Sequence, residues 1–230
     1  MEYILNGIKE AFVIIISCNK DFLKIVSISI FVTTISTILA SFFGIICGVF
    51  IAQTKFLFKN VVITIFSTLM SLPTVLVGLV LYAFFSHKGF LGSYGLLFTR
   101  SAMIIGQIVL IFPIIVGLTI SCIKNLDKRI WETIISLGAN KIQSFLLFLK
   151  EARYGFFAAI IAGFSRGFSE VGVSMMLGGN IKDYTRNITT AIALETSKGN
   201  FALGIALGFV LLFVALLINI LFSFLQKKIR

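Results

Sequence analysis

The run LKIVSISIFVTTISTILASFFGIICGVFIA, from Leu23 to Ala52, contains one charged residue, Lys24, near its start. All its other side chains are apolar, small or hydroxyl-bearing. The run exceeds the roughly 20 residues that an α-helix needs to cross the hydrocarbon core of a bilayer. A helix satisfies its own backbone hydrogen bonds in lipid, so this stretch predicts an all-α integral membrane protein.

Four further apolar runs follow it along the chain, each long enough for one span. They cover residues 58–85, 102–122, 156–177 and 201–225. We therefore expect about five transmembrane helices. Pro73 and Pro113 lie inside the second and third spans, where each removes a backbone hydrogen bond and is expected to bend its helix.

The N-terminal segment before these spans is short. Residues Met1 to Ile16 lack the cationic start and small-residue cleavage site of a signal peptide, and they are too few to span comfortably. We predict that residues 1–22 form an interfacial or re-entrant segment, with a sixth short span as the alternative. No Pro/Gly/Ser-rich linker divides the rest, so residues 23–230 are expected to form one membrane domain.

Composition supports this class of protein. Of the 230 residues, 58% are hydrophobic and only 13% are charged, and the mean hydropathy is +1.07, far from an ordinary soluble domain. The net charge of +11 comes from short Lys and Arg clusters between apolar runs, which is typical of loops that meet lipid headgroups rather than nucleic acid. Cys18, Cys47 and Cys122 have no metal-ligand spacing, so neither a metal site nor a disulfide is expected.

The distribution of Lys and Arg predicts the orientation. The longest charged insert, residues 124–153, follows the third span, and Lys55, Lys59 and the C-terminal tail fall on the same side. Cytoplasmic loops carry an excess of Lys and Arg, so this side is predicted to be the cytoplasm and the N-terminus to be outside.

Small residues predict where helices pack. In lipid, backbones approach closely where Gly, Ala or Ser recurs at every fourth position. Such residues occur on the first, fourth and fifth spans: Ser36, Ala40, Gly44, Gly48 and Ala52; Gly155, Ala159, Gly163 and Gly167; Gly204 and Gly208.

The fourth span carries two charges, Arg166 and Glu170, one helical turn apart. Charges at membrane depth are costly, so they normally face the bundle interior or a water-filled cavity and are paired. One interpretation is a pathway lining in which Arg166 offers positive potential to an anion, Glu170 holds it in place and Ser169 extends the polar face. The other is an ion pair that only fixes helix packing.

Two loops add candidate functional residues. The outer loop from Gly178 to Thr190 carries Lys182, Arg186 and several hydroxyls, which suit an oxyanion, although a solvated turn has the same composition. The inner segment from Ile130 to Leu149 has helical spacing on both sides of Gly138, which predicts two short amphipathic helices. Such a face fits a groove of a partner protein or lies against lipid.

Several kinds of enzyme are disfavoured. The chain has no Gly-x-x-x-x-Gly-Lys-Ser/Thr phosphate loop, so it is not expected to hydrolyse a nucleotide alone. His87 is the only histidine, and neither His-Glu-x-x-His nor Gly-x-Ser-x-Gly occurs, which argues against a membrane protease or metalloenzyme.

The inner segment resembles the cytoplasmic coupling motif of ABC importer permeases. Glu132-Thr-Ile stands at its acidic start, and Leu137-Gly138-Ala139 stands at its centre. The sequence departs from the motif at Thr133 and Ile134, where alanines are usual, and in the region of Lys150, where a proline often closes the motif.

Further stretches narrow the resemblance, which runs from about Phe22 to the C-terminus. SLPTVLVGLVLY, residues 71–82, and RGFSEVG, residues 166–172, look like segments of molybdate and tungstate permeases. Residues 178–181, 185–186 and 189–199 look most like the tungstate branch.

This resemblance implies a type I ABC importer permease: a homodimer in the bacterial cell membrane, with an ATPase subunit beneath each copy and an extracytoplasmic oxyanion-binding protein. This chain would itself bind no cofactor, with ATP on the partner subunit. Tungstate is the expected substrate, with molybdate or sulfate as alternatives. A stand-alone channel or secondary transporter is the rival of another class, and a scaffold subunit would leave the two intramembrane charges unexplained.

The expected site residues fall into three groups. Those that couple to the ATPase are Glu132, Leu137, Gly138 and Ala139. Those that line the translocation pathway are Pro73, Arg166, Ser169 and Glu170. Those that face the binding protein from the outer loop are Asn180, Thr185 and Arg186.

Overall fold

The computed structural model describes residues 2–17, 20–126, 136, 138 and 140–229, and every regular element in these ranges is a helix. The all-α prediction is confirmed. The elements in chain order are α1 (Glu2–Ser17), α2 (Lys20–Gln53), α3 (Lys59–Leu69), α4 (Thr74–Phe85), the short 3-10 helix η1 (Gly92–Tyr94), α5 (Arg100–Lys124), α7 (Lys141–Phe168), α8 (Gly172–Gly178), α9 (Ile188–Ser197) and α10 (Phe201–Ile229).

The spans agree with the predicted number, but two of them are broken. The helices α2, α5 and α10 are each long and apolar enough to cross a membrane, and up to five spans result if each of two bent pairs counts as one. The pair α3 and α4 bends by 96°, and the pair formed by the end of α7 and α8 bends by 59°. Pro73 explains the first break, because it cannot donate a backbone hydrogen bond and disfavours a helical residue before it.

The N-terminal segment forms α1, a helix of 16 residues. It packs against α10, with Gly7 so close that a Cβ there would lie 2.6 Å from Ile205 Cγ2. The interfacial placement of residues 1–22 stays a prediction.

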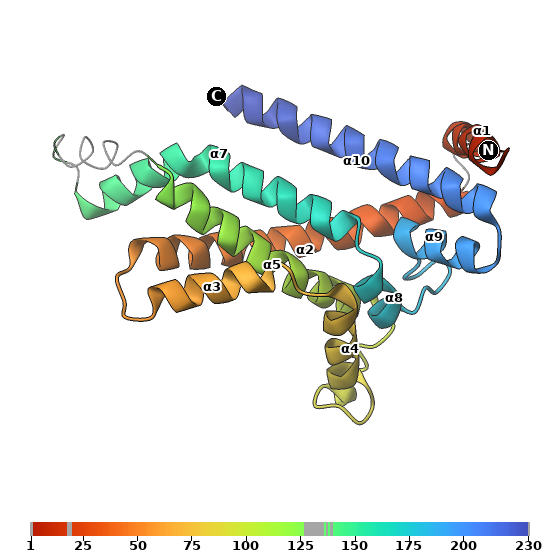
Figure 1. Ribbon diagram of the computed structural model, residues 1–230, viewed down its shortest axis with the longest axis horizontal. Helices are drawn as coiled ribbons and strands as arrows, with labels where there is room; N and C mark the ends of the chain where they lie inside the picture. Colours follow the sequence, from red (N-terminus) through yellow and green to blue (C-terminus); the bar gives the residue numbers. More distant parts are fainter. Residues whose placement is uncertain (1, 18–19, 127–135, 137, 139, 230) are drawn as a thin grey trace.

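The bundle is elongated, with α2, α5 and α7 packed along one another (Figure 1). Helix α3 lies beside α5, α10 runs along the opposite side, and α4 projects from the bundle next to α8. The turn between α2 and α3 and the start of α7 lie at one end, whereas α1, α9 and the start of α10 lie at the other. The turn carrying Lys55 and the start of α7 therefore share one end, and the assignment of this end to the cytoplasm stays a prediction.

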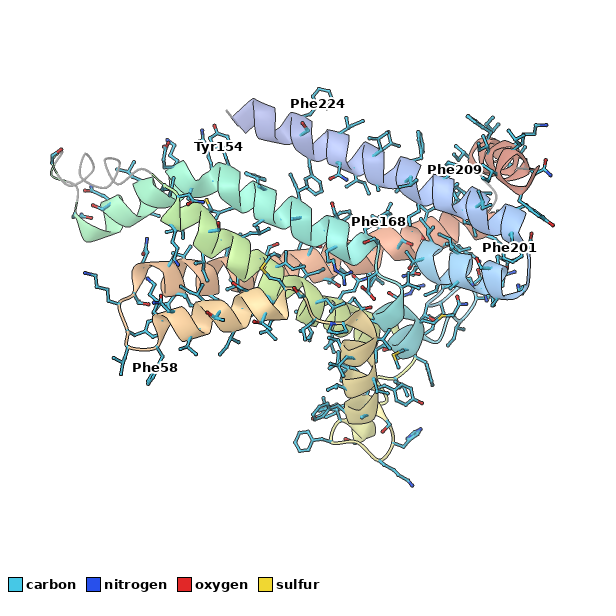
Figure 2. The ribbon with its side chains drawn as sticks, viewed as in Figure 1. Phe58, Tyr154, Phe168, Phe201, Phe209 and Phe224 are labelled. Atoms are coloured by element: carbon cyan, nitrogen blue, oxygen red, sulfur yellow. The ribbon has the colours of Figure 1, made fainter. Side chains whose placement is uncertain are left out.

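Lipid-facing and core-facing surfaces differ clearly. Ile111 and Ile115 of α5 are fully buried in the core. The exposed side chains of α10 are almost all apolar, and Figure 2 shows Phe224 pointing away from the bundle. Because α10 exposes many Leu, Ile and Phe side chains, it has the surface expected of a helix that faces hydrocarbon.

The glycine stripes are confirmed as close contacts in the first and fourth spans. A Cβ at Gly44 would lie 3.0 Å from Ile115 Cγ2, and one at Gly163 would lie 2.8 Å from Ile111 Cγ2. In the fifth span the stripe is only partly used: Gly204 approaches Thr196 of α9, but nothing among the described residues lies within 4 Å of a Cβ at Gly208. Pro113 is buried inside α5, which continues through it.

Replacing Gly163 with leucine is expected to lower stability. The added side chain would overlap the rigid, branched Ile111 and Ile115, and overpacking of this kind costs about 1–3 kcal/mol. Gly208→Leu is the matched control, because its helical site is open and leucine favours a helix more than glycine does. We expect the melting temperature of the purified protein in detergent to fall for Gly163→Leu only. Equal melting temperatures would mean that α5 and α7 can separate without loss.

Candidate translocation site

The breaks in the second and fourth spans meet at one place, which we call the elbow: Pro73, Thr74, residues 166–170 and Gly172. Pro73 precedes the first residue of α4, and Ser169 follows the last residue of α7. A Cβ at Gly172 would lie 2.9 Å from Thr74 Oγ1 and 3.4 Å from Glu170 Oε1. The start of α8 therefore packs closely against the start of α4 beside the Glu170 carboxylate, and a side chain at position 172 would have to displace the Thr74 hydroxyl.

The Arg166 and Glu170 side chains form an ion pair, with 2.7 Å between Arg166 Nη1 and Glu170 Oε2. The other carboxylate oxygen, Oε1, accepts a hydrogen bond of 3.0 Å from the Val173 amide at the start of α8. A buried carboxylate is stable only when it is paired and its oxygens are hydrogen-bonded. Both conditions hold here, so the predicted pairing is present and Glu170 also caps the helix that follows it.

The two members of the pair differ in exposure. The Glu170 side chain is 1% exposed, whereas that of Arg166 is 33% exposed. Of the five N–H donors on a guanidinium, one is engaged with Glu170. Arg166 therefore presents positive charge at the surface of the bundle while Glu170 anchors it from inside.

Ser169 is exposed at the same turn, and its hydroxyl donates to the carbonyl oxygens of Ser165, at 3.1 Å, and Arg166, at 3.2 Å. Its proton is thus directed back to the helix. The Ser169 hydroxyl can therefore act toward its surroundings only as a hydrogen-bond acceptor.

Two polar residues that sequence reasoning did not select donate hydrogen bonds to the elbow, and a third connects α2 to α9. Gln107 of α5 donates to Gly167 O at 3.1 Å, and Thr189 of α9 donates to Glu170 O at 2.8 Å. Ser29 of α2 accepts from the Ile188 amide at 2.9 Å. Gln107 is the only amide side chain in the run 102–122, and an amide inside a span is a sequence signal that could have identified it.

The outer-loop residues Asn180, Thr185 and Arg186 lie together. Arg186 donates to Asn180 Oδ1 at 3.1 Å and to Asn180 O at 3.2 Å. Thr185 is fully buried and donates to Gly178 O at 2.5 Å. The loop is therefore a structured unit in which Thr185 has an internal role.

Two exposed ion pairs connect this loop to the start of α2. Lys24 pairs with Asp183 and Lys182 pairs with Asp21, each at 3.1 Å. Exposed pairs contribute about 0–1 kcal/mol each, so their contribution to the stability of the loop is small.

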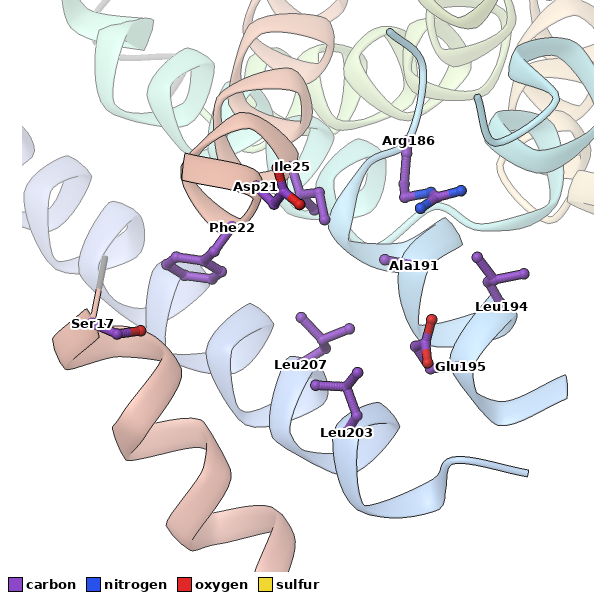
Figure 3. Close-up of a pocket in the computed structure, with 10 residues that line it drawn as sticks. All are labelled: Ser17, Asp21, Phe22, Ile25, Arg186, Ala191, Leu194, Glu195, Leu203 and Leu207. Atoms are coloured by element: carbon purple, nitrogen blue, oxygen red, sulfur yellow. The ribbon is translucent and has the colours of Figure 1, made fainter. Parts of the chain in front are cut away.

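Arg186 lines a pocket of about 270 Å³ between the starts of α2 and α10 and the helix α9 (Figure 3). Asp21 and Glu195 also line it, and Leu203 and Leu207 of α10 form an apolar part. The pocket thus combines both signs of charge with apolar surface.

The predicted coupling residues lie in the insert between α5 and α7. Glu132, Leu137 and Ala139 are outside the described residues. Gly138 is exposed, with φ of +75°, so the chain turns there as the sequence predicts.

The helix after this turn is longer than expected. Asn140 caps α7 in a capping box, accepting from the Gln143 amide at 2.9 Å while its own amide donates to Gln143 Oε1 at 3.0 Å. From Lys141 the helix continues without a break for 28 residues to Phe168. The separate short helix predicted there is therefore wrong, because the helical phase continues through Lys150 and Arg153 into the span. One helix joins the insert to the Arg166–Glu170 pair.

The architecture matches known importers. The protein superposes on a chain of a bacterial ABC transporter involved in the import of the acidic polysaccharide alginate, with a TM-score of 0.75 and 16% sequence identity. The superposition covers 95% of this chain and 83% of the other chain. The fold is thus that of an ABC importer permease.

The chain belongs to the family described as binding-protein-dependent transport system inner membrane component, whose family model matches residues 40–230. It is 40% identical over 206 residues to the tungstate uptake system permease protein of Peptoclostridium acidaminophilum, covering 90% of each chain. It is 37% identical to the protein of that description from Campylobacter jejuni, covering 90% of this chain and 86% of the other. Family and helices together define a multi-pass protein of the cell membrane.

Proposed function

We propose that this chain is the permease subunit of an ABC importer that takes up tungstate, driven by ATP hydrolysis on a separate ATPase subunit. The observation that carries the proposal is the 40% identity to a tungstate uptake permease over 90% of both chains. Molybdate and sulfate are dianions of similar shape, so selection among the three falls mainly to the binding protein that delivers the anion.

The elbow supports the passage of a dianion. Half-helices that begin at membrane depth direct unpaired backbone N–H groups and positive dipole ends at anions. The α4 helix begins at Thr74 in this way, next to the ion pair. Arg166 adds a full positive charge at the same place. A twofold arrangement of two copies would bring the second Arg166 toward the same axis and raise the potential further.

The long helix α7 supports coupling to an ATPase. Nucleotide stabilises one state of the ATPase pair, and any differential contact with the insert at Gly138 biases the permease toward the matching state. Because α7 is continuous, a tilt at its capped start also displaces Arg166, which lies near its other end. In this mechanism hydrolysis removes the bias and resets the elbow.

The partners follow from this mechanism. The insert around Gly138, including Glu132, Leu137 and Ala139, docks on the ATPase. The outer loop with Asn180 and Arg186 faces the extracytoplasmic binding protein. Two copies of the chain form the permease, and lipid surrounds α10.

The test is reconstitution of the chain with its ATPase and its binding protein in liposomes. We expect ATP hydrolysis to rise most when the binding protein carries tungstate, and less with molybdate or sulfate. The control omits the permease and contains the same ATPase. Hydrolysis that does not rise with tungstate-loaded binding protein, or anion flux through the purified chain without ATP, would refute the proposal.

A further inference from the structure

The fourth span breaks at a place where the backbone could continue as one helix. No proline interrupts residues 156–177, yet α7 ends and α8 begins inside this range. In a continuous α-helix the Val171 amide would donate to Gly167 O, four residues before it. Here no described residue accepts from the Val171 amide, and Gly167 O accepts from the Glu170 amide at 3.2 Å. The last turn of the helix is therefore tightened to the 3-10 type.

Gln107 of α5 supplies a donor that the break takes away. Its Nε2 donates to Gly167 O at 3.1 Å. The orientation of this amide is fixed by chemistry, because a carbonyl oxygen only accepts and must face the NH₂ group. Helix α5 continues through this level without a break. In the broken span Gly167 O thus has a side-chain donor from a neighbouring helix in place of the Val171 amide.

The surroundings of Gln107 suit an apolar side chain. Gln107 is 1% exposed, and Met103 and Ile111, one turn away on either side, are fully buried. Its Oε1 has no hydrogen-bond partner among the described residues. Because a buried polar atom without a partner lowers stability, an apolar side chain of similar length would pack here at least as well. The bond to Gly167 O is therefore what distinguishes glutamine from such a side chain.

The break determines what the Glu170 carboxylate can reach. Its Oε2 pairs with Arg166 on α7, and its Oε1 accepts from the Val173 amide on α8, so the carboxylate connects both sides of the break. In a continuous helix the Val173 amide would donate to Ser169 O instead. Straightening the span would therefore free Oε1 and remove the second anchor of the ion pair.

We propose that Gln107 is a positioning residue for transport, which stabilises the broken form of the fourth span and through it the placement of Glu170 and Arg166. This inference rests on the proposed function and adds a residue that does not touch the anion. Gly167 O can accept from Gln107 in the broken form or from the Val171 amide in the continuous form. The span can thus change shape by exchanging one hydrogen bond for another. Loss of the Gln107 donor favours the continuous form by about two- to tenfold.

The first experiment compares transport with stability. Gln107→Met removes the donor and keeps an unbranched side chain, whereas Gln107→Asn keeps an amide that is one methylene too short to reach Gly167 O. The matched control is Thr119→Val on the same helix, which removes another fully buried polar atom without a partner among the described residues. We expect tungstate uptake by the reconstituted transporter to fall about two- to tenfold for both Gln107 variants and to stay unchanged for the control.

The melting temperature of the purified chain in detergent is expected to be the same for Gln107→Met and Thr119→Val. Normal uptake by Gln107→Met would overturn the inference. A melting temperature that falls together with uptake would also overturn it, because Gln107 would then only hold helices together.

The second experiment measures the geometry of the break directly. A Cβ at Gly172 would lie 2.9 Å from Thr74 Oγ1, so cysteines at these two positions are within reach of a disulfide. Thr74→Cys and Gly172→Cys are combined in a background where Cys18, Cys47 and Cys122 are replaced, and a mild oxidant is added to the folded, purified protein. We expect the disulfide to form at least about threefold more slowly with Gln107→Met than with Gln107 or with Thr119→Val.

An equal rate of disulfide formation in all three backgrounds would overturn the inference, because the break would not depend on Gln107. Disulfide formation requires no anion, so the two proposals can fail separately. Equal rates combined with normal stimulation of ATP hydrolysis by tungstate would reject the positioning role and spare the proposed function. Slower disulfide formation with Gln107→Met, in a protein that tungstate does not stimulate, would support the role of Gln107 in the break and reject the proposed function.

Discussion

Replacing Gly138 with valine is expected to abolish ATP-driven uptake and to leave the membrane bundle folded. Gly138 has φ of +75°, a conformation that costs an L-residue about 1–2 kcal/mol, and more when the side chain is β-branched. The described part of the chain places nothing within 4 Å of a Cβ there, so the effect is a change in the direction of the turn and not a clash. Uptake by proteoliposomes measures the first half of this expectation, and the melting temperature of the purified chain in detergent measures the second.

Gly199→Val is the matched control. Gly199 has φ of +78°, and it too is open, since no described neighbour lies within 4 Å of its Cβ position. It joins α9 to α10 at the outer end, so the same backbone strain is applied away from the ATPase. Glu132→Lys, in the insert but outside the described residues, should match Gly138→Val. Full uptake by Gly138→Val, or an equal loss with Gly199→Val, would contradict the coupling role.

Arg166→Met is expected to lower uptake about ten- to hundredfold. The change removes a charge-assisted hydrogen bond of about 1.5–3 kcal/mol, where every 1.4 kcal/mol corresponds to a factor of ten. It also leaves the buried Glu170 carboxylate without its cation. Uptake normalised to the amount of protein in the membrane measures the effect. Phe42→Leu is the control, because Phe42 is 62% exposed on the apolar surface of α2.

A neutral double variant separates a transport role from a packing role. Arg166→Met combined with Glu170→Gln removes both charges, and replacing a buried pair by uncharged groups is often tolerated. Glutamine retains an oxygen for the Val173 amide. We expect the melting temperature to recover toward that of the original protein while uptake stays low. Recovery of both would reduce the pair to a packing element.

The sequence predicted those features that depend on local patterns. The number of spans follows from apolar length, the pairing of Arg166 with Glu170 from helical spacing, and the turn at Gly138 from the conformational freedom of glycine. Pro73 predicts a bend in the second span. The sequence does not predict the bend angle of 96°, because this angle depends on the contact of α4 with α8.

The features that the sequence could not predict depend on tertiary contacts. The run 156–177 contains no proline, and its break after Phe168 coincides with hydrogen bonds from Gln107 and Thr189, which come from distant parts of the chain. Thr185 was expected on the outer surface, yet its hydroxyl turns inward to Gly178 O. The direction of a hydroxyl in a loop is set by the local backbone, which composition does not reveal.

The unbroken course of α7 has a consequence for how this chain can vary in length. Each residue added between Asn140 and Arg166 would rotate the guanidinium by about 100° and shift it by about 1.5 Å along the axis. A single insertion would thus turn Arg166 away from the elbow, whereas an addition close to a whole number of turns would restore its direction. The length of chain between the insert and Arg166 can therefore change only by about a whole number of helical turns if Arg166 is to keep its direction.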